Sequence, residues 1–164
     1  MKDELEDFRR TIERGAARLR LISESESGEP LSEGKWSARE VIGHLIDSAS
    51  HNHQRFVRAQ LEDEMVFPTY RQEEWVRVQR YQEEPWPLLV QLWESYNLHL
   101  LHVISSVSVE TRERARATHN LHRIAWRTVP QSEPVTLRYF MLDYIGHLKN
   151  HLRQIFKEDA SVDQ

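Results

Sequence analysis

The amino-acid sequence predicts a single all-α domain, built as a four-helix bundle with long crossover connections. Apolar residues recur at intervals of three and four along four long segments, which is the spacing of one face of an α-helix. Only 5 Gly and 6 Pro occur in 164 residues, too few for the many tight turns of an all-β domain. The length suits one domain, which we expect to cover residues 1–158, followed by a C-terminal tail at 159–164.

The first two long helices are predicted from apolar spacing and from a capping motif. Apolar spacing predicts a first helix over residues 2–23, and the polar segment 23–34, which contains Ser, Gly and Pro, is expected to be a loop. Ser37 and Glu40 have the spacing of a capping box, so the second helix is expected to begin there and to run to about residue 61. The apolar stripe of the first helix consists of Leu5, Phe8, Ile12, Leu19 and Ile22.

The second half of the chain predicts two more long helices. Segment 72–81 is expected to form a shorter helix inside a long crossover, and Pro85 or Trp86 then opens the third long helix. The polar segment 110–134 suggests one short helix followed by a loop, and Thr136 is a suitable N-cap for the last helix. The apolar stripe of the third helix consists of Leu88, Leu89, Leu92, Trp93, Tyr96, Leu100, Val103, Ile104 and Val107.

Charge and composition argue against several classes of function. Lys plus Arg number 22 and Asp plus Glu 26, a formal charge of −4 without a basic patch, so we expect no nucleic-acid partner. The absence of cysteine excludes a disulfide framework, a thiolate zinc site and a cysteine nucleophile. No apolar signal segment follows Met1, and the apolar runs are shorter than the roughly 20 residues that span a bilayer. We therefore expect a cytoplasmic protein with no membrane partner.

The chain has nine histidines, and their positions select three as candidate metal ligands. His147 and His151 are four residues apart, so on a helix the two imidazoles lie one above the other and can chelate one ion. Both border the apolar stripe of the last helix, and His44 borders that of the second helix. Polar groups beside a core face need partners, and a divalent metal ion would supply one. Spacing alone leaves open that these are ordinary histidines satisfied by hydrogen bonds.

Four other polar residues are candidates for the surroundings of this site. His51 lies about 10.5 Å of helical rise from His44, too far to share one ion easily, but His51 and His99 could both line a pocket. Asp47 and Asp143 each lie one turn from a predicted ligand, so either could act as a base or hold a histidine in place. The simpler alternative is that both are solvated helix charges.

The five tryptophans offer large faces for a pocket or a dimer interface. Most are expected to be packing residues. Trp93, which is predicted to point inward from the third helix, is the best candidate for a pocket wall.

Two histidine-containing segments carry a resemblance to a known family. Residues 35–48, KWSAREVIGHLIDS, resemble the opening of the second helix in the DinB-like (DinB/YfiT) family, and residues 143–155, DYIGHLKNHLRQI, resemble its closing helix. Residues 70–76, YRQEEWV, and 92–100, LWESYNLHL, resemble one branch of that family. The resemblance therefore extends over most of the chain.

The resemblance implies a bundle of up-down-down-up topology, often dimeric, with nickel or zinc on three histidines at its centre. The ligands map onto His44, His147 and His151. Asn150 departs from the pattern because many relatives have another histidine there, but that position is not a ligand and the triad stays intact. We therefore expect a divalent metal cofactor, Ni or Zn, together with a homodimer and a small-molecule substrate.

Three functions remain compatible with such a site. Three neutral imidazoles leave a divalent ion one open position, where an activated water could attack an electrophile, which predicts a metal-dependent hydrolase. In some relatives a low-molecular-weight thiol is used instead, which implies a metal-assisted thiol transferase or isomerase. The third alternative is a non-catalytic, stress-linked binding or assembly module. A pocket that opens beside the metal site would favour an enzyme, and a closed site would favour the module.

Overall fold

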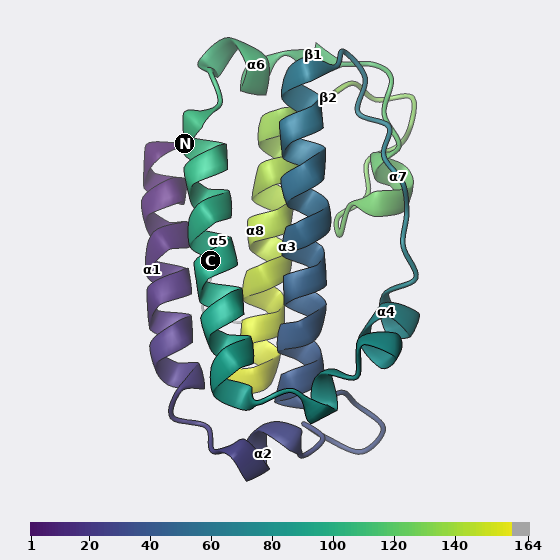
Figure 1. The fold of residues 1–164 in the computed structure, drawn as a ribbon. Coiled ribbons are helices and arrows are strands. Elements are labelled where there is room, and N and C mark those ends of the chain that lie inside the picture. The colour runs from purple at the N-terminus through teal and green to yellow at the C-terminus, as the bar shows by residue number, and fades with distance from the viewer. Residues whose placement is uncertain (159–164) are drawn as a thin grey trace.

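Four long helices form a bundle in this computed structural model, which describes residues 1–158 (Figure 1). The helices α1 and α8 run in one direction and α3 and α5 in the other, so the topology is up-down-down-up (Figure 1). The predicted all-α four-helix bundle is therefore confirmed. The C-terminal tail predicted at 159–164 lies outside the described residues. The long helices are α1 (Lys2–Leu19), α3 (Ala38–Leu61), α5 (Trp86–Ser106) and α8 (Leu137–Phe156).

Short elements lie in the connections between the long helices. The connection from α1 to α3 contains α2 (Glu24–Gly28), and the crossover from α3 to α5 contains α4 (Gln72–Gln79) and the 3₁₀ helix η1 (Tyr81–Glu83). Because α3 and α5 are parallel, this crossover must return along the length of the bundle, past one side of α3 (Figure 1). The crossover expected from the sequence is thus present, with its helix close to the predicted segment 72–81.

The connection from α5 to α8 contains more structure than the sequence predicts. It holds α6 (Val109–Glu113), β1 (Ala115–Arg116), α7 (Leu121–Ile124) and β2 (Val135–Thr136). The two strands pair antiparallel, with Ala115 opposite Thr136 and Arg116 opposite Val135. The expectation of one short helix and a loop over 110–134 was therefore wrong, because strands of two residues are too short to leave a periodic pattern.

Side-chain caps fix where α2, α3 and α8 begin. The Ser37 hydroxyl accepts a hydrogen bond from the Glu40 N–H at 3.3 Å, and the Glu40 carboxylate accepts one from the Ser37 N–H at 2.9 Å. Thr136 caps α8 in the predicted way. A second capping box, Ser23 with Glu26, starts α2 where the sequence predicted a loop, and α1 accordingly ends at Leu19 rather than at residue 23.

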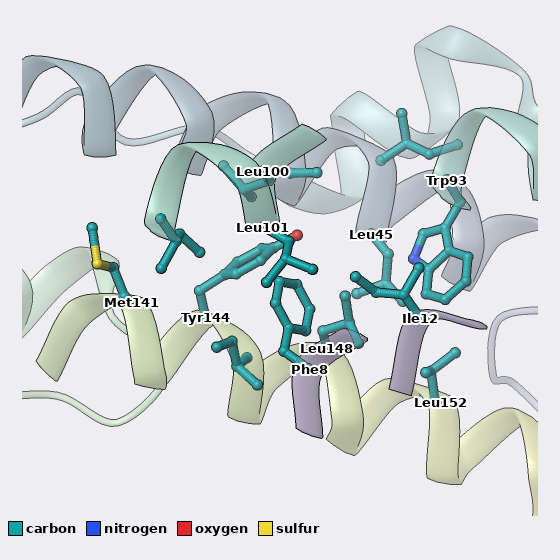
Figure 2. Packing of buried hydrophobic residues seen from close by; sticks show 14 of the residues in the cluster. Phe8, Ile12, Leu45, Trp93, Leu100, Leu101, Met141, Tyr144, Leu148 and Leu152 are labelled. Atoms are coloured by element: carbon teal, nitrogen blue, oxygen red, sulfur yellow. The ribbon is translucent and has the colours of Figure 1, made fainter. Parts of the chain in front are cut away.

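Apolar side chains from all four long helices fill the centre of the bundle (Figure 2). Inside this core the Tyr144 hydroxyl donates a hydrogen bond to Asn97 Oδ1 at 2.5 Å, which satisfies two buried polar groups. Two residues of the predicted α5 stripe lie outside the core, since Leu88 and Leu92 are half-exposed. Within residues 1–158 no helix is long and apolar enough to cross a membrane.

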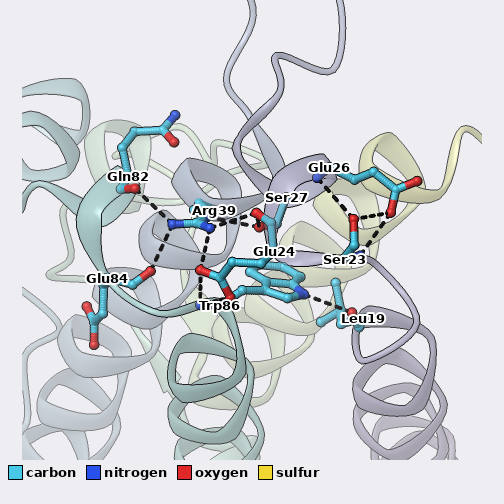
Figure 3. Close-up of polar contacts among 9 residues, drawn as sticks. All are labelled: Leu19, Ser23, Glu24, Glu26, Ser27, Arg39, Gln82, Glu84 and Trp86. Atoms are coloured by element: carbon cyan, nitrogen blue, oxygen red, sulfur yellow. Dashed lines mark hydrogen bonds and ion pairs between the residues drawn. The ribbon is translucent and has the colours of Figure 1, made fainter.

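A buried arginine joins two connections at the end of the bundle where α3 begins (Figure 3). Arg39 Nε donates to the Ser27 hydroxyl at 2.9 Å, and its Nη1 donates to the carbonyl oxygens of Gln82 and Glu84. Its Nη2 pairs with the Glu24 carboxylate. This side chain therefore ties α2 and the segment before α5 to the first turn of α3, close to His44.

Candidate metal centre

Three histidines from two helices meet in the interior of the bundle. His44 lies on α3, whereas His147 and His151 lie one turn apart on α8. The Nε2 atom of His147 is 3.3 Å from Nε2 of His44 and 3.1 Å from Nε2 of His151. One nitrogen from each ring lies within 4.8 Å of the other two. The fold thus brings together the three histidines that the sequence selected.

The donor set fits a divalent metal ion. A tetrahedral ion with metal–nitrogen distances of about 2.0–2.1 Å separates its ligand nitrogens by about 3.3 Å. The two Nε2–Nε2 distances at His147 are close to that value. Imidazole nitrogen is a good ligand for zinc and nickel alike, so the donor chemistry does not distinguish the two metals.

Burial keeps these imidazoles neutral. Burial, together with repulsion by a charged His151, lowers the pKa of His44 to about 3. The pKa of His147 is also lowered to about 3, first by burial and then by His151 and His44. At neutral pH each ring therefore keeps an unprotonated nitrogen, which is the form that binds a metal.

One outer contact orients a ligand ring. The Nδ1 atom of His151 lies 3.0 Å from Oε1 of Gln154. An amide oxygen only accepts, so this contact places the proton on Nδ1 and leaves the Nε2 lone pair facing the other two rings. His44 Nδ1 is buried and has no hydrogen-bond partner within residues 1–158, and the Trp36 ring packs against the same imidazole at 5.3 Å.

A pocket of about 430 Å³ opens beside the triad. His147 and His151 belong to its wall, so a molecule in the pocket would touch the ligand rings. Its wall also contains polar groups from α3 and aromatic rings from α8 and from the loop before β2. These further lining residues include Ser48, Asn52, Arg55, Tyr70, Arg123, Trp126, Phe140, Asp143, Tyr144 and Asn150.

Asp143 holds a loop against this pocket rather than acting as a solvated helix charge. One carboxylate oxygen accepts the Trp126 N–H at 2.8 Å and the other accepts the Arg127 N–H at 2.7 Å. Burial raises the pKa of Asp143, and the two backbone hydrogen bonds oppose that rise. Within residues 1–158 no hydrogen bond joins its carboxylate to the triad, so it is not the outer partner of a ligand that the sequence suggested.

Asp47 is also a buried structural group. Its Oδ1 atom accepts hydrogen bonds from Gln79 Nε2 and from the Tyr81 hydroxyl, both at 2.8 Å. Burial raises the pKa of the Asp47 carboxyl. The side chain therefore binds the crossover to α3, and the alternative of a solvated charge was wrong here as well.

Trp126, one of the five tryptophans offered as pocket candidates, forms a wall of the site, although the sequence favoured Trp93 for this place. Its ring stands edge-on to the His147 ring at 6.3 Å. A Cβ atom at Gly146 would lie 3.1 Å from the indole, so the glycine before His147 lets the ring approach α8 closely. Gly146 is apparent in the sequence, but its partner Trp126 lies in an irregular loop, so the contact between them could not be predicted.

Trp93, the predicted pocket wall, lies in the core instead. It is fully buried, and its ring packs against Gly15 of α1, where an added Cβ would lie 3.0 Å away. The apolar stripe of α5 correctly placed Trp93 on the inward face. The Trp93 ring, however, packs against α1 and is not among the described residues that line the pocket.

Two candidate histidines lie away from the triad. His51 stacks on Tyr70 with ring centroids 3.9 Å apart, and it is not among the described residues that line the pocket. His99 is exposed and contacts His53 across the α3–α5 groove, with ring centroids 5.0 Å apart. Neither is part of the cluster formed by His44, His147 and His151.

Similar proteins point to one family. Residues 7–155 match the family model of the DinB superfamily. A curated relative from Halalkalibacterium halodurans, named "putative metal-dependent hydrolase", is 28% identical over 93 residues. That match covers 57% of this chain and 54% of the relative, so the chain spans about half the length of the relative.

Two solved structures share the fold. YfiT from Bacillus subtilis, described as a probable metal-dependent hydrolase with an unusual four-helix bundle topology, matches with a TM-score of 0.74 at 17% identity. That match covers 96% of this chain and 86% of YfiT. A mycothiol-dependent maleylpyruvate isomerase matches with a TM-score of 0.56 at 18% identity, over 93% of this chain and 58% of the isomerase. Because the family model matches nearly the whole chain, this protein belongs to the DinB superfamily.

Proposed function

We propose that this protein is a metal-dependent hydrolase that acts on a small molecule, with zinc or nickel held by His44, His147 and His151. The observation that carries the proposal is the meeting of three imidazole nitrogens at the wall of an open pocket. The names of the similar proteins from Halalkalibacterium halodurans and Bacillus subtilis support the same reaction class.

The chemistry divides between the ion and the chain. His44, His147 and His151 would hold a divalent ion, which would supply a Lewis acid able to lower the pKa of a bound water molecule. The chain holds the three rings in one geometry and lines the approach with Trp126 and Phe140, which limit the access of bulk water. The Tyr70 hydroxyl is protonated at neutral pH, and burial raises its pKa further, to about 12. Asp143 is the one carboxylate among the described lining residues, and both of its oxygens are already engaged.

A thiol-dependent transferase or isomerase is the alternative reaction for the same triad. A low-molecular-weight thiol would arrive as a co-substrate, since the chain has no cysteine of its own. The non-catalytic module is the less favoured alternative, because a pocket of about 430 Å³ opens beside the triad.

Metal analysis tests the site. Protein purified without a His tag is compared with His44→Ala and His147→Ala, with His102→Ala as the control because this histidine is exposed on α5. We expect close to one ion per chain in the native protein and the control, and a large loss in the two site variants. Equal metal content in all four proteins would contradict the assignment.

Activity assays separate the reaction classes. The metal-loaded protein is offered chromogenic esters and amides, and in parallel a small thiol with an electrophilic acceptor. We expect hydrolysis that a chelator abolishes and added zinc or nickel restores. Thiol consumption without hydrolysis would favour the transferase, and inactivity in both assays would favour the module.

We also propose that the protein works in the cytoplasm as a homodimer without a nucleic-acid partner. Size-exclusion chromatography with light scattering tests the dimer. A mass of about one chain, 19.6 kDa, would contradict it.

A further inference from the structure

The pocket beside the triad contains a buried arginine that has no acidic partner. Arg55 lies on α3, is 6% exposed and belongs to the same pocket wall as His147 and His151. Within residues 1–158 no carboxylate lies within ion-pair distance of its guanidinium group, and burial lowers its pKa. A buried charge without a counter-charge is costly, so its presence in a pocket wall calls for an explanation.

Most of the hydrogen-bond donors of Arg55 are still available. Its Nη1 lies 3.4 Å from Asn52 Oδ1, and its Nη2 donates to the carbonyl oxygen of Pro68 at 3.1 Å. A guanidinium group has five N–H donors, so an acceptor that enters the pocket can still bind to it. The Cζ atom lies 6.0 Å from the centroid of the Phe140 ring, which supports the group from one side.

The charges of the pocket wall favour a ligand with one negative charge. Arg55 and Arg123 are positive, whereas Asp143 is negative and engaged with backbone N–H groups. The planar guanidinium group of Arg55, with N–H groups still free, matches the two oxygens of a carboxylate. A dianion would be repelled more strongly by the negative charge of Asp143.

We propose that Arg55 binds the carboxylate of the substrate and that the reacting bond lies at the other end of the pocket, beside His147 and His151. The Arg55 guanidinium lies over Phe140, and Phe140 precedes His147 on α8 by about 10.5 Å of helical rise. The carboxylate is therefore remote from the bond that reacts, and Arg55 positions the substrate. The orientation of the substrate, with its reacting bond at the histidines, rests on the proposed function. Carboxylate binding by Arg55 itself requires no ion.

Calorimetric titration of the metal-free full-length protein tests the inference. Benzoate is the probe, benzamide is its neutral counterpart, and inorganic phosphate at equal ionic strength is the dianionic alternative. We expect saturable benzoate binding, with benzamide and phosphate both weaker. Removing one charge-assisted anchor should weaken benzoate binding at least about tenfold in Arg55→Met. Arg58→Met should stay within about twofold of the native protein, because Arg58 is exposed on the same helix.

Several results would overturn the inference. These are no saturation by benzoate in the native protein, equal affinity in Arg55→Met, or tighter binding of phosphate than of benzoate. If circular dichroism shows that Arg55→Met does not fold, Arg55→Lys replaces it, since it keeps the charge and removes the fork. Its benzoate affinity should fall at least about threefold, and unchanged affinity would count against the inference.

Metal content, measured on the same preparations before the ion is removed, separates this inference from the proposed function. Native protein that holds no ion would contradict the proposed function. Unchanged benzoate binding in Arg55→Met would contradict the role of Arg55 alone.

Discussion

The Asp143 carboxylate accepts a hydrogen bond from the backbone N–H of Trp126 at 2.8 Å, and this contact places an indole ring beside the histidine triad. The acid lies one helical turn before His147, and the loop residue packs against the ring of that histidine. The wall of the site therefore depends on a side chain that, within the described residues, forms no hydrogen bond to the three histidines.

Replacing Asp143 by Asn should destabilise the protein by about 1–3 kcal/mol, because an amide can accept only one of the two buried N–H bonds well. Backbone amides 126 and 127 should exchange faster with solvent as the loop loosens. Urea denaturation and hydrogen exchange measure the two effects. Asp63→Asn is the control, since Asp63 pairs with Arg114 at the surface, and it should change stability by less than about 0.5 kcal/mol.

Replacing Gln154 by Ala should weaken metal binding without abolishing it. The amide oxygen holds the His151 ring in the metal-binding tautomer, but Gln154 is exposed and water can replace it in part. We expect a loss of affinity of no more than about tenfold, the lower end for such outer contacts. Competition with a chromogenic chelator measures it. Gln60→Ala is the control, because Gln60 is also an exposed glutamine on a long helix, and it should leave the metal affinity unchanged. A loss of metal affinity in Gln154→Ala as large as that in His151→Ala would contradict the outer role of Gln154.

Replacing Gly43 by Ala should destabilise the bundle strongly. A Cβ atom there would lie 2.1 Å from the Tyr81 ring, whose hydroxyl is anchored on Asp47, so the crossover must move. Overpacking of this kind costs about 1–3 kcal/mol or more, which outweighs the gain in helix propensity. Thermal unfolding measures it. Gly28→Ala, where the nearest foreign atom is 3.8 Å away, should be nearly neutral.

A double variant checks the cause of the Gly43 effect. Tyr81→Leu removes the ring but also loses the hydrogen bond to Asp47, so it is destabilising alone. With Gly43→Ala in the same chain, the total loss should be smaller than the sum of the two single losses. If the two losses of stability simply add, the clash with Tyr81 is not the cause of the loss in Gly43→Ala.

The metal-free protein should lose stability as the pH falls below about 6.5. In the unfolded chain a histidine has a pKa of about 6.5, whereas burial lowers the pKa of His44 and of His147 to about 3 in the fold. Between these two pKa values the unfolded chain binds more protons than the folded protein does. The free energy of unfolding therefore decreases as the pH is lowered, by up to about 1.4 kcal/mol per pH unit for each group. Urea titrations at pH 7.5, 6.5 and 5.5 measure the slope.

The contribution of the triad to this slope is isolated by substitution. The pKa values of Asp47 and Asp143 are raised in the fold. These two groups therefore stabilise the folded state as they take up protons, which opposes the loss of stability caused by the histidines. His44→Gln should reduce the loss between pH 6.5 and 5.5. An unchanged slope in that variant would show that His44 is not buried in its neutral form.

The parts of the fold and site that the sequence predicted rest on local rules. The pair His147 and His151 is defined by the helical repeat, and the Ser37–Glu40 capping box is contained in one turn. Ser23 and Glu26 show the same signal, but the neighbouring Gly28 and Pro30 favoured a loop over a helix of a single turn.

The parts that could not be predicted depend on partners distant in the chain. Asp143 bonds to backbone atoms 16 and 17 residues earlier, in a segment without periodicity. Trp93 and Leu92 both belong to the apolar stripe of α5, yet one is buried and the other half-exposed. A helical wheel gives the direction of each side chain but not what the neighbouring helix brings against it.

The histidine triad also has a consequence for the order of events when the protein is made. His44 and His147 are 103 residues apart, so a ribosome adding about 5–20 residues each second places them in the chain roughly 5–20 s apart. Until α8 has emerged and packed against α3, the nascent chain offers the ion only one of its three imidazoles. An ion held by the triad would therefore be loaded only after synthesis of the chain.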